Sequence, residues 1–535
     1  MATFLMLALV ATRAFAQAPI GQCQASPAPF DASKGAQWNG WAPGLTNTRF
    51  QPTPQAGVTA EQASKLTLKW AFGFANIGSA WAPPSVAGGR VFVGSQSGTV
   101  YSLDAKTGCI VWTFQVKGAV RSGITIGPRT GGGTGSSVAY FGDLTANAYA
   151  VNAATGELLW TRKVDEHALS RITGTPTLHQ DRLYVPVASL EEGQGRNAKY
   201  ECCTFRGSIV ALNASTGALA WKSYTIDQEA KPIGKTSAGL TRFGPSGAGI
   251  WSAPTIDPKR GVLYAATGNM YTEPQQTTSD AVVAFDLNTG KRVWSTQATT
   301  KDVFVVGCGG PPPTQTAAAG AAATKGPNCP DDLGPDFDFG GSPMLATLPN
   351  GRDLIVIGQK SGVAWAFDPD KRGAVVWQYT AGKGSALGGM EWGSAVDGER
   401  AYFPVSDILL PEPGGLHAVR LDTGQRAWYA APPSPTCGTS RGCNGALSAA
   451  ITVIPGVVFA GSNDGAVRGY STKDGSIVWE FDTNRDFETV NGVAAKGGSI
   501  NGPGPIVAGG MLYINSGYGS FGGRPGNVLL AFGIE

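Results

Sequence analysis

The sequence predicts an all-β protein, an eight-bladed β-propeller whose last blade is closed by strands from both ends of the chain. Three observations lead to this prediction: a strand–turn–strand phrase that occurs seven times, a tryptophan that ends each copy, and complementary half-copies near the termini. Successive repeat tryptophans lie between 42 residues (Trp70 to Trp112) and 83 residues (Trp294 to Trp377) apart. Four-stranded repeats of this length are typical of propeller blades.

The first copy of the phrase is SLDAKTGCIVW, residues 102–112. It joins an alternating apolar strand to a second short strand through a tight turn. Asp104 opens the turn, where its side chain can bond to the local backbone, and Gly108 supplies the positive φ that the turn requires. The other six copies occupy residues 150–160, 211–221, 284–294, 366–377, 418–428 and 469–479.

The two ends of the chain each carry half of the phrase. Trp70 ends the segment LTLKWAF without the preceding turn, and residues 527–532 form the strand of the phrase without its tryptophan. Pairing of these halves would complete an eighth blade and leave no open sheet edge. A β-solenoid could use the same turns, but the divided terminal blade disfavours it. We therefore expect one propeller domain over residues 17–535, in spite of the length.

Composition and the N-terminal residues indicate an exported protein. The chain has 76 glycines, 15% charged residues and a net charge of +3, with no basic run of the kind that binds nucleic acid. Residues 1–16 hold a short apolar run that ends in Ala-Phe-Ala, which predicts a signal peptide although a basic n-region is missing. No later segment is long enough to span a membrane. We expect export to a bacterial periplasm.

Eight cysteines in an exported chain indicate disulfides rather than zinc ligands. Cys308 and Cys329 bracket an insert rich in Pro, Ala, Gly and Thr, which we expect to be mobile and tethered by a bridge. Cys437 and Cys443 enclose a short loop in the same way. A bridge between the remaining Cys23 and Cys109 would pin the N-terminal segment onto the first repeat.

Cys202 and Cys203 are neighbours in the sequence. Adjacent Cα atoms are about 3.8 Å apart across a trans peptide, below the usual disulfide window of about 4.4–6.8 Å. A bridge between them would be strained, and strain of this kind persists where function needs it. The alternative is that each cysteine pairs elsewhere or stays free.

The tryptophan-ended repeats and the Cys-Cys pair together resemble the alcohol dehydrogenases that depend on pyrroloquinoline quinone (PQQ), which are eight-bladed propellers. The resemblance covers residues 38–535. It is strongest to the polyvinyl alcohol dehydrogenase branch, through WNGW (38–41), NTRFQ (47–51), YECCTFRGS (200–208) and GGSINGPGP (497–505). It implies that Cys202 and Cys203 form a disulfide against one face of PQQ. In several relatives the pair lies one blade earlier than here.

The resemblance also implies a calcium site. The segment RLYVPVASLEE matches the family's first calcium motif and points to Glu191 as the ligand, with Glu192 as a close alternative. The corresponding motifs point to Asn269 as the second ligand and to Asp338 as both the third ligand and the catalytic base. Two carboxylates and an amide oxygen suit Ca²⁺, a hard cation. Lanthanide-using relatives carry an Asp where this chain has Gly340, so calcium is favoured.

Further residues match the family's cofactor contacts. Trp251 corresponds to the tryptophan that stacks on the quinone, Thr173 to a threonine that bonds a PQQ carboxylate, and Lys360 to the cation that reaches the reactive carbonyl. Two more residues are weaker candidates for cofactor binding by their positions near these motifs: Arg206 and Trp392.

These residues predict alcohol oxidation by hydride transfer to PQQ, with secondary alcohols and polyvinyl alcohol as substrates. Asp338 would accept the hydroxyl proton and Lys360 would act with Ca²⁺ on the quinone carbonyl. None of the three histidines follows a cysteine in a Cys-x-x-Cys-His pattern, so electrons are expected to leave to a separate soluble cytochrome c. The alternative is a scaffold propeller of the outer-membrane assembly type, which would lack the Cys-Cys pair and the ligand set.

Overall fold

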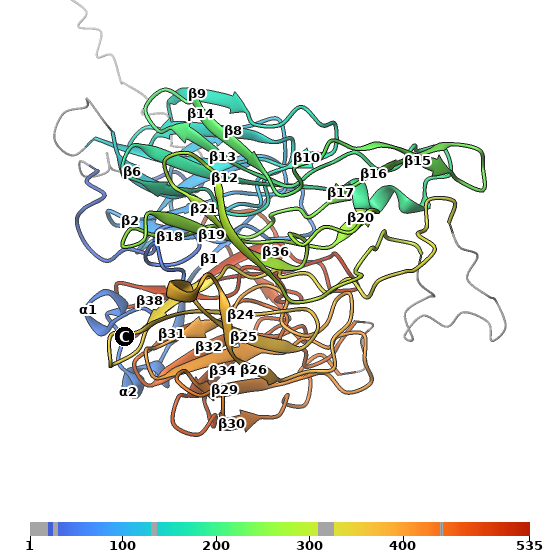
Figure 1. The fold of residues 1–535 in the computed structure, drawn as a ribbon. Helices are drawn as coiled ribbons and strands as arrows, with labels where there is room; N and C mark the ends of the chain where they lie inside the picture. The colour runs from blue at the N-terminus through green and yellow to red at the C-terminus, as the bar shows by residue number, and fades with distance from the viewer. Residues whose placement is uncertain (1–19, 25–29, 130–135, 309–325, 439, 441) are drawn as a thin grey trace, which may run out of the picture.

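The computed structural model describes residues 20–24, 30–129, 136–308, 326–438, 440 and 442–535. The predicted signal peptide and residues 309–325 of the predicted insert lie outside this range. The described chain is nearly all strand, and eight antiparallel sheets, seven with four strands and one with five, surround a central axis, which confirms the predicted propeller (Figure 1). No helix in these ranges is both long enough and apolar enough to cross a membrane.

The first four blades follow the chain from the inside of the propeller outward. Blade 1 is made of β2 (Ser85–Ala87), β3 (Arg90–Val93), β4 (Thr99–Asp104) and β5 (Ile110–Gln115). Blade 2 is made of β6 (Thr125–Pro128), β7 (Ser137–Gly142), β8 (Asn147–Asn152) and β9 (Leu158–Lys163). Blade 3 is made of β11 (Thr177–His179), β12 (Arg182–Ser189), β13 (Ser208–Asn213) and β14 (Leu219–Tyr224). Blade 4 is made of β18 (Thr255–Asp257), β19 (Val262–Ala266), β21 (Ala281–Asp286) and β22 (Arg292–Gln297).

The last four blades follow the same order, and the eighth joins both ends of the chain. Blade 5 is made of β23 (Met344–Thr347), β24 (Asp353–Gly358), β25 (Val363–Asp368) and β26 (Ala374–Thr380). Blade 6 is made of β27 (Ala395–Val396), β28 (Arg400–Pro404), β29 (Leu416–Arg420) and β30 (Arg426–Ala430). Blade 7 is made of β31 (Thr452–Ile454), β32 (Val457–Gly461), β33 (Ala466–Ser471) and β34 (Ile477–Asp482). Blade 8 is made of β37 (Ile506–Ala508), β38 (Met511–Ser516), β39 (Val528–Gly533) and the N-terminal β1 (Thr67–Gly73).

The repeated turn holds each blade to the next. Asp104 Oδ1 accepts the N–H of Thr107 at 2.9 Å and its hydroxyl at 2.8 Å, and Gly108 has φ +73°. The turn glycine of one blade packs on the tryptophan of the preceding blade: a Cβ on Gly156 would lie 2.8 Å from Trp112 Cε3. Glycine is therefore required here both for its positive φ and for its missing side chain.

The tryptophan also bonds across the same blade junction. Trp112 Nε1 donates to the carbonyl of Ala153 in blade 2 at 3.0 Å. The same bond to the following blade is made by Trp70, Trp160, Trp221, Trp377, Trp428 and Trp479. Between the blades lie apolar clusters, such as the one that joins Phe92 of blade 1 to Phe141 of blade 2. Burial of these faces supplies the main stabilisation of the ring.

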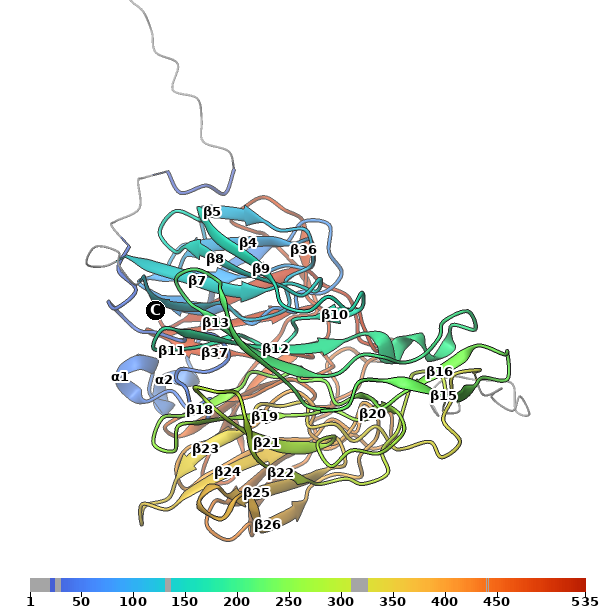
Figure 2. The same ribbon diagram turned by 45° about the horizontal axis from the view of Figure 1, so that its top comes forward.

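Shorter elements lie at the two ends of the propeller. At one end are α1 (Thr53–Ala56) and α2 (Ala60–Ala63). At the other end, in Figures 1 and 2, are β10 (Ser170–Arg171), the projecting hairpin of β15 (Lys231–Lys235) and β16 (Thr241–Gly244), and the pair of β17 (Ser246–Gly247) and β20 (Met270–Thr272). The remaining short elements are η1 (Glu191–Arg196), η2 (Pro369–Lys371), β35 (Asp486–Phe487) and β36 (Ala495–Lys496).

An N-terminal belt, residues 38–51, runs around the axis inside the blades. It bonds in turn to the second residue of seven innermost strands. Trp38 pairs with Val86 in blade 1, and the Asn39 side chain pairs with the backbone of Ile126 in blade 2. The belt's later partners, in blades 4 to 8, are Ile256, Leu345, Val396, Val453 and Val507. The belt therefore closes the axial channel and forms a floor beneath the loops that precede these strands.

All eight cysteines form disulfides, in the pairs that were expected. The bridges are Cys23–Cys109, Cys202–Cys203, Cys308–Cys329 and Cys437–Cys443. The first links the N-terminal segment to the turn of blade 1, and the third closes the base of the insert.

Candidate functional site

The loops that carry most of the predicted site residues open at the same end of the propeller. Neighbouring strands are antiparallel, so the start of each innermost strand and the end of each second strand lie at one end. Thr173 and Trp251 each lie four residues before an innermost strand, β11 and β18, and Asp338 precedes β23. Asn269 and Lys360 follow the second strands β19 and β24.

Asp338 lies at the centre of this group. Its Oδ1 accepts the backbone N–H of Asn269 at 2.7 Å, and its Oδ2 accepts Lys360 Nζ at 3.0 Å. Lys360 Nζ also contacts Asp336 Oδ1 at 3.1 Å. The side-chain nitrogen of Asn269 donates to the carbonyls of Met270 and Phe304, at 2.8 and 2.9 Å, so its Oδ1 is the end that is left to bind a cation. The structure thus brings together three of the predicted residues, Asn269, Asp338 and Lys360.

Glu191 and Glu192 have different surroundings. The Glu191 carboxylate is fully buried and accepts the N–H of Thr204 at 2.9 Å, the N–H of Phe205 at 2.8 Å and the hydroxyl of Tyr200 at 2.8 Å. Burial would raise its pKa, but the hydrogen bonds from His167 and Phe205 outweigh it and lower the pKa. Glu191 therefore anchors the loop after the cysteine pair.

Glu192 faces the Asp338 cluster instead. Burial and the charge of Asp338 raise the pKa of Glu192 to about 8, while Lys360 opposes this rise. Since the carboxylate of Glu191 is already occupied by the loop, the geometry favours Glu192, the alternative, over Glu191 as the calcium ligand. Adjacent residues in a 3₁₀ turn point about 120° apart, which explains why only one of them reaches the axis.

Carboxylates outnumber cations in this cluster. Burial alone would lower the pKa of Lys360, but the charges of Asp336 and Asp338 raise it well above its usual value. Burial, with repulsion from Asp302 and Asp338, raises the pKa of Asp280 well above its usual value. A divalent cation would offset this excess of negative charge. In the described ranges no three His, Cys, Asp or Glu side chains form a metal site by themselves, so a cation here needs the amide oxygen of Asn269 as well.

Gly340 has no room for a larger residue. A Cβ there would overlap the Trp251 ring and the carbonyl oxygen of Glu391. The additional carboxylate that the lanthanide-using relatives carry therefore cannot be accommodated in this arrangement, which is consistent with calcium.

An aromatic cavity adjoins the cluster at the axis. Its walls come from the loops that precede the innermost strands of successive blades, with Trp41 of the belt below; its main side chains are Trp41, Trp81, Arg121, Thr173, Trp251 and Trp392. Trp251 and Trp392 pack edge to face with ring centres 5.4 Å apart. Lys360 Nζ lies 5.6 Å from the Trp251 ring centre, so this lysine joins the cavity to Asp338.

Arg121 lines the cavity, and a second arginine, Arg171, lies two residues before the wall residue Thr173. Arg121 lies 4.5 Å from the Trp392 ring centre and donates to the hydroxyl of Tyr518 at 3.0 Å. Burial and repulsion from Arg121 lower the pKa of Arg171. Arg171 Nε and the hydroxyl of Ser252, which lines the cavity, are buried without a hydrogen-bond partner. Buried donors of this kind cost about 1–3 kcal/mol each unless a ligand binds them.

These residues fit a flat anionic ring such as PQQ. Indoles provide stacking surfaces, Arg121 provides a positive charge, and the unpartnered hydroxyl of Ser252 provides a donor for a carboxylate. The free space between the side chains is about 30 Å³, about the volume of one water molecule. A tricyclic ring therefore requires the indoles of Trp251 and Trp392 to separate as it enters.

The cysteine pair does not reach this cavity. Neither Cys202 nor Cys203 lines it. Both are buried in an apolar cluster with Phe205, Tyr271 and Val305, and their backbone pairs with Phe243. The disulfide therefore lies outside the walls of this cavity, and its predicted position against the quinone stays a prediction. The cavity's own stacking surfaces are indoles.

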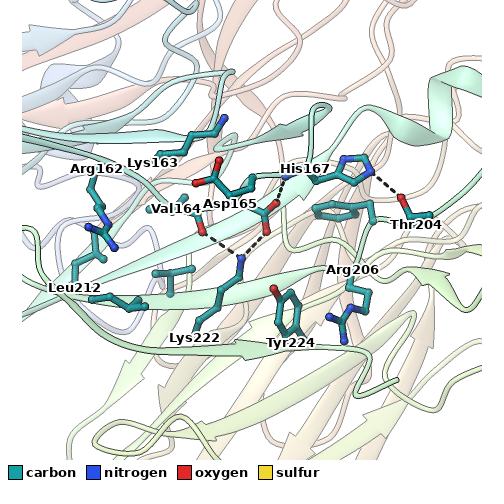
Figure 3. A pocket seen from close by; sticks show the side chains of 14 residues that line it. Arg162, Lys163, Val164, Asp165, His167, Thr204, Arg206, Leu212, Lys222 and Tyr224 are labelled. Atoms are coloured by element: carbon teal, nitrogen blue, oxygen red, sulfur yellow. Dashed lines mark hydrogen bonds and ion pairs between the residues drawn. The ribbon is translucent and has the colours of Figure 1, made fainter. Parts of the chain in front are cut away.

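Arg206 also lies elsewhere, in a cleft of about 340 Å³ between the outer strands β9 and β14 (Figure 3). Its guanidinium lies 4.0 Å from the Tyr224 ring centre and donates to the carbonyl of Ile226. Nearby, Lys222 pairs with Asp165 at 2.6 Å. Arg206 does not line the aromatic cavity, whereas Thr173, Trp251 and Trp392 do.

Sequence reasoning missed several residues of the cavity, chiefly Trp41, Trp81 and Arg121. Trp81, Arg121, Thr173 and Trp251 each stand four residues before the innermost strand of their blade. Alignment of the blades on these strands would have found Trp81 and Arg121, since this loop position lines the cavity in blades 1 to 5. Trp41 has no such signal.

Comparison with protein families gives two matches. Residues 38–316 match the family described as glucose/ethanol/alcohol dehydrogenase, β-propeller domain, and residues 337–500 match outer membrane protein assembly factor BamB. The first match covers more than half of the chain.

Similar proteins include two polyvinylalcohol dehydrogenases. The protein of a Pseudomonas species is 43% identical over 526 residues, which cover 96% of this chain and 79% of the relative. That of a Sphingopyxis species is 39% identical over 530 residues with the same coverage. Among solved structures, the quinohemoprotein alcohol dehydrogenase ADHIIG of Pseudomonas putida has a TM-score of 0.67 at 17% identity, covering 94% of this chain and 81% of its own. At that identity the structural likeness shows the fold.

Proposed function

This chain belongs to the PQQ-dependent alcohol dehydrogenase family, in its polyvinyl alcohol dehydrogenase branch, and we propose that it oxidises secondary alcohols, including the repeating hydroxyls of polyvinyl alcohol. The observation that carries the proposal is the contact of Asp338 with both Lys360 and the backbone of Asn269, beside a cavity of indoles and arginines. In this arrangement a carboxylate that can act as a base (Asp338) and a positive side chain (Lys360) lie next to a cavity that can bind a flat anionic ring.

The chain's own residues account for the acid–base part of the reaction. Asp338 would accept the proton of the substrate hydroxyl as hydride leaves the carbinol carbon, a role that contributes about 10²–10⁴-fold to the rate. Hydrogen bonds from Asn269 N–H and Lys360 Nζ fix the orientation of its two oxygens.

The cofactors would be held by residues on both sides of Lys360. Glu192, Asn269 Oδ1 and Asp338 would bind Ca²⁺, with Glu192 taking the place expected for Glu191. Thr173, Arg121 and Arg171 would bind the carboxylates of PQQ, and Trp251 would stack on its ring. When bound, PQQ supplies the two-electron acceptor for hydride and Ca²⁺ supplies a Lewis acid at its carbonyl.

The electrons would then pass to a separate soluble cytochrome c, in the periplasm. This part of the proposal rests on the predicted signal peptide, on the disulfides and on the need for a one-electron carrier to reoxidise the cofactor. Cell fractionation and reduction of purified cytochrome c would test it.

The function is tested by adding PQQ and Ca²⁺ to the metal-free protein. We expect a shift in the PQQ absorption spectrum, quenching of tryptophan fluorescence, and dye reduction with polyvinyl alcohol or a small secondary alcohol. Addition of a chelator before PQQ should prevent dye reduction, whereas the same chelator followed by excess Ca²⁺ should restore it.

A scaffold role is the second candidate, because residues 337–500 match the BamB family. The buried, unpartnered donors of Arg171 and Ser252 weigh against it, since a protein without a ligand has no use for them. Absence of both the spectral shift and dye reduction would favour the scaffold.

A further inference from the structure

Arg49 of the belt is a completely buried arginine whose partners are all neutral. Its Nε donates to the carbonyl of Ile451 at 2.6 Å and its Nη1 to the carbonyl of Trp41 at 2.6 Å. Its Nη2 donates to the Thr452 hydroxyl and to the carbonyls of Pro503 and Pro505, at 3.1–3.2 Å. Five hydrogen bonds thus hold the guanidinium, and none of them goes to a carboxylate.

Two of these partners line the aromatic cavity. Trp41 and Pro503 are both part of its wall, and the Arg49 guanidinium lies 4.6 Å from the Trp41 ring centre. The indole of Trp41 is also held from the other side, where a Cβ on Gly393 would lie 2.8 Å from it. Arg49 therefore lies directly behind the cavity floor and sets the positions of two floor residues.

The charge of Arg49 is not balanced within its surroundings. Burial lowers its pKa to about 9, and no neighbouring charge contributes to the shift. Arg468 provides the contrast: it is equally buried, but it pairs with Asp464 at 2.8 Å and with Glu480. A buried charge without a partner is costly, and it is retained where something else compensates it.

We propose that Arg49 is a positioning residue for the anionic cofactor: it fixes Trp41 and Pro503 as the floor of the cavity, and the cofactor's carboxylates compensate its buried positive charge. This inference rests on the proposed function. The inference extends the proposed function by coupling cofactor binding to the belt, which contacts seven of the eight blades. Binding should therefore stabilise the propeller as a whole, because it offsets the cost of the buried charge.

The test compares dissociation constants for PQQ, measured by tryptophan fluorescence quenching at saturating Ca²⁺. We expect Arg49→Gln to raise the Kd about 10-fold or more. Arg49→Lys keeps the positive charge but cannot make the same five hydrogen bonds, so its Kd should lie between those of wild type and Arg49→Gln. Arg468→Lys is the matched control: it should lower the Tm but leave the Kd within about two-fold of wild type. Equal Kd values for wild type and Arg49→Gln would overturn the proposal, and equal losses in the two Arg49 variants would overturn its electrostatic part.

A second measurement uses the wild-type protein alone and so does not depend on the folding of a variant. Amide hydrogen exchange in residues 38–51 is expected to slow on loading with PQQ and Ca²⁺ by a larger factor than exchange in β33, which contains Arg468. Equal slowing in the two segments would contradict the inference. A wild-type protein that does not bind PQQ at all would instead contradict the proposed function.

Discussion

The rim of the propeller and its open axial end use the same repeat in opposite ways. At the rim, a tryptophan packs on the turn glycine of the next blade, and seven of these indoles donate to a backbone carbonyl there. At the axial end, one loop position carries Trp81, Arg121, Thr173 and Trp251 in blades 1 to 4. The rim repeats because each junction has the same packing problem. The axial end varies because the loops surround one asymmetric site and each contributes a different group to it.

The largest effect is expected at the axial end, from Asp338→Asn. Loss of the base should lower kcat by about 10²–10⁴-fold in protein that is saturated with PQQ and Ca²⁺, and the Tm should fall because Lys360 loses a buried partner. Asp397→Asn, which alters a structural turn in blade 6, is the control and should keep wild-type kcat. Near-normal turnover by an Asp338→Asn protein saturated with PQQ and Ca²⁺ would show that Asp338 is not the base. The contrast between a catalytic axial end and a structural rim would then lose its main support.

At the rim, Gly156→Ala should cost about 3 kcal/mol of unfolding free energy. About 1 kcal/mol comes from the left-handed backbone at φ +78°, and the rest from overlap with Trp112. Gly261→Ala is the matched control, because Gly261 has φ +67° but nothing within 4 Å of its Cβ position, so about 1 kcal/mol is expected. Chemical denaturation measures both. If both variants lose the same unfolding free energy, packing between blades does not explain why the turn geometry recurs in each copy of the repeat.

Glu191 and Glu192 allow a sharper comparison, since Glu191 holds the loop after the cysteine pair and Glu192 faces Asp338. Glu192→Gln should weaken Ca²⁺ binding about 10-fold or more with little change in Tm. Glu191→Gln should instead destabilise the fold by about 2 kcal/mol, because a buried charged acceptor of two backbone N–H groups is lost. Calcium titration and thermal unfolding of each variant separate the two roles, and a reversed pattern would restore Glu191 as the ligand.

The smallest effect is a pH dependence of the metal-free protein. The pKa of Glu192 is raised to about 8 and that of Glu391 to about 7, in both cases chiefly by burial, from a usual value of 4.5. Between pH 4.5 and 8 the folded state therefore holds more protons than the unfolded state, so stability should fall as pH rises through this window. Saturating Ca²⁺ should flatten the decline, and so should Glu192→Gln in part. A metal-free Tm that rises over this range would contradict the assigned surroundings of Glu192.

The repeat made the propeller predictable, because every copy contains its own strand and turn and the tryptophan that contacts the next blade. Asn269, Asp338 and Lys360 were predictable for a different reason: each lies in a short motif next to a strand, so its position is set locally. Glu191 and Arg206 were assigned by counting along irregular loops. There, one residue more or less changes the direction in which a side chain points, and the sequence contains no signal for that direction.

The amino-acid sequence by itself determined the number of blades, the closure of the ring by Trp70 and residues 527–532, and the motifs that carry Asp338 and Lys360. All of these follow from patterns within one blade or from the two ends of the chain. Only the tertiary structure decided that Glu192 rather than Glu191 faces Asp338, that Arg121 shares a cavity with four indoles, and that the belt with Arg49 lies beneath it. These depend on which side chains from different blades meet at the axis, and that convergence exists only once the ring has closed.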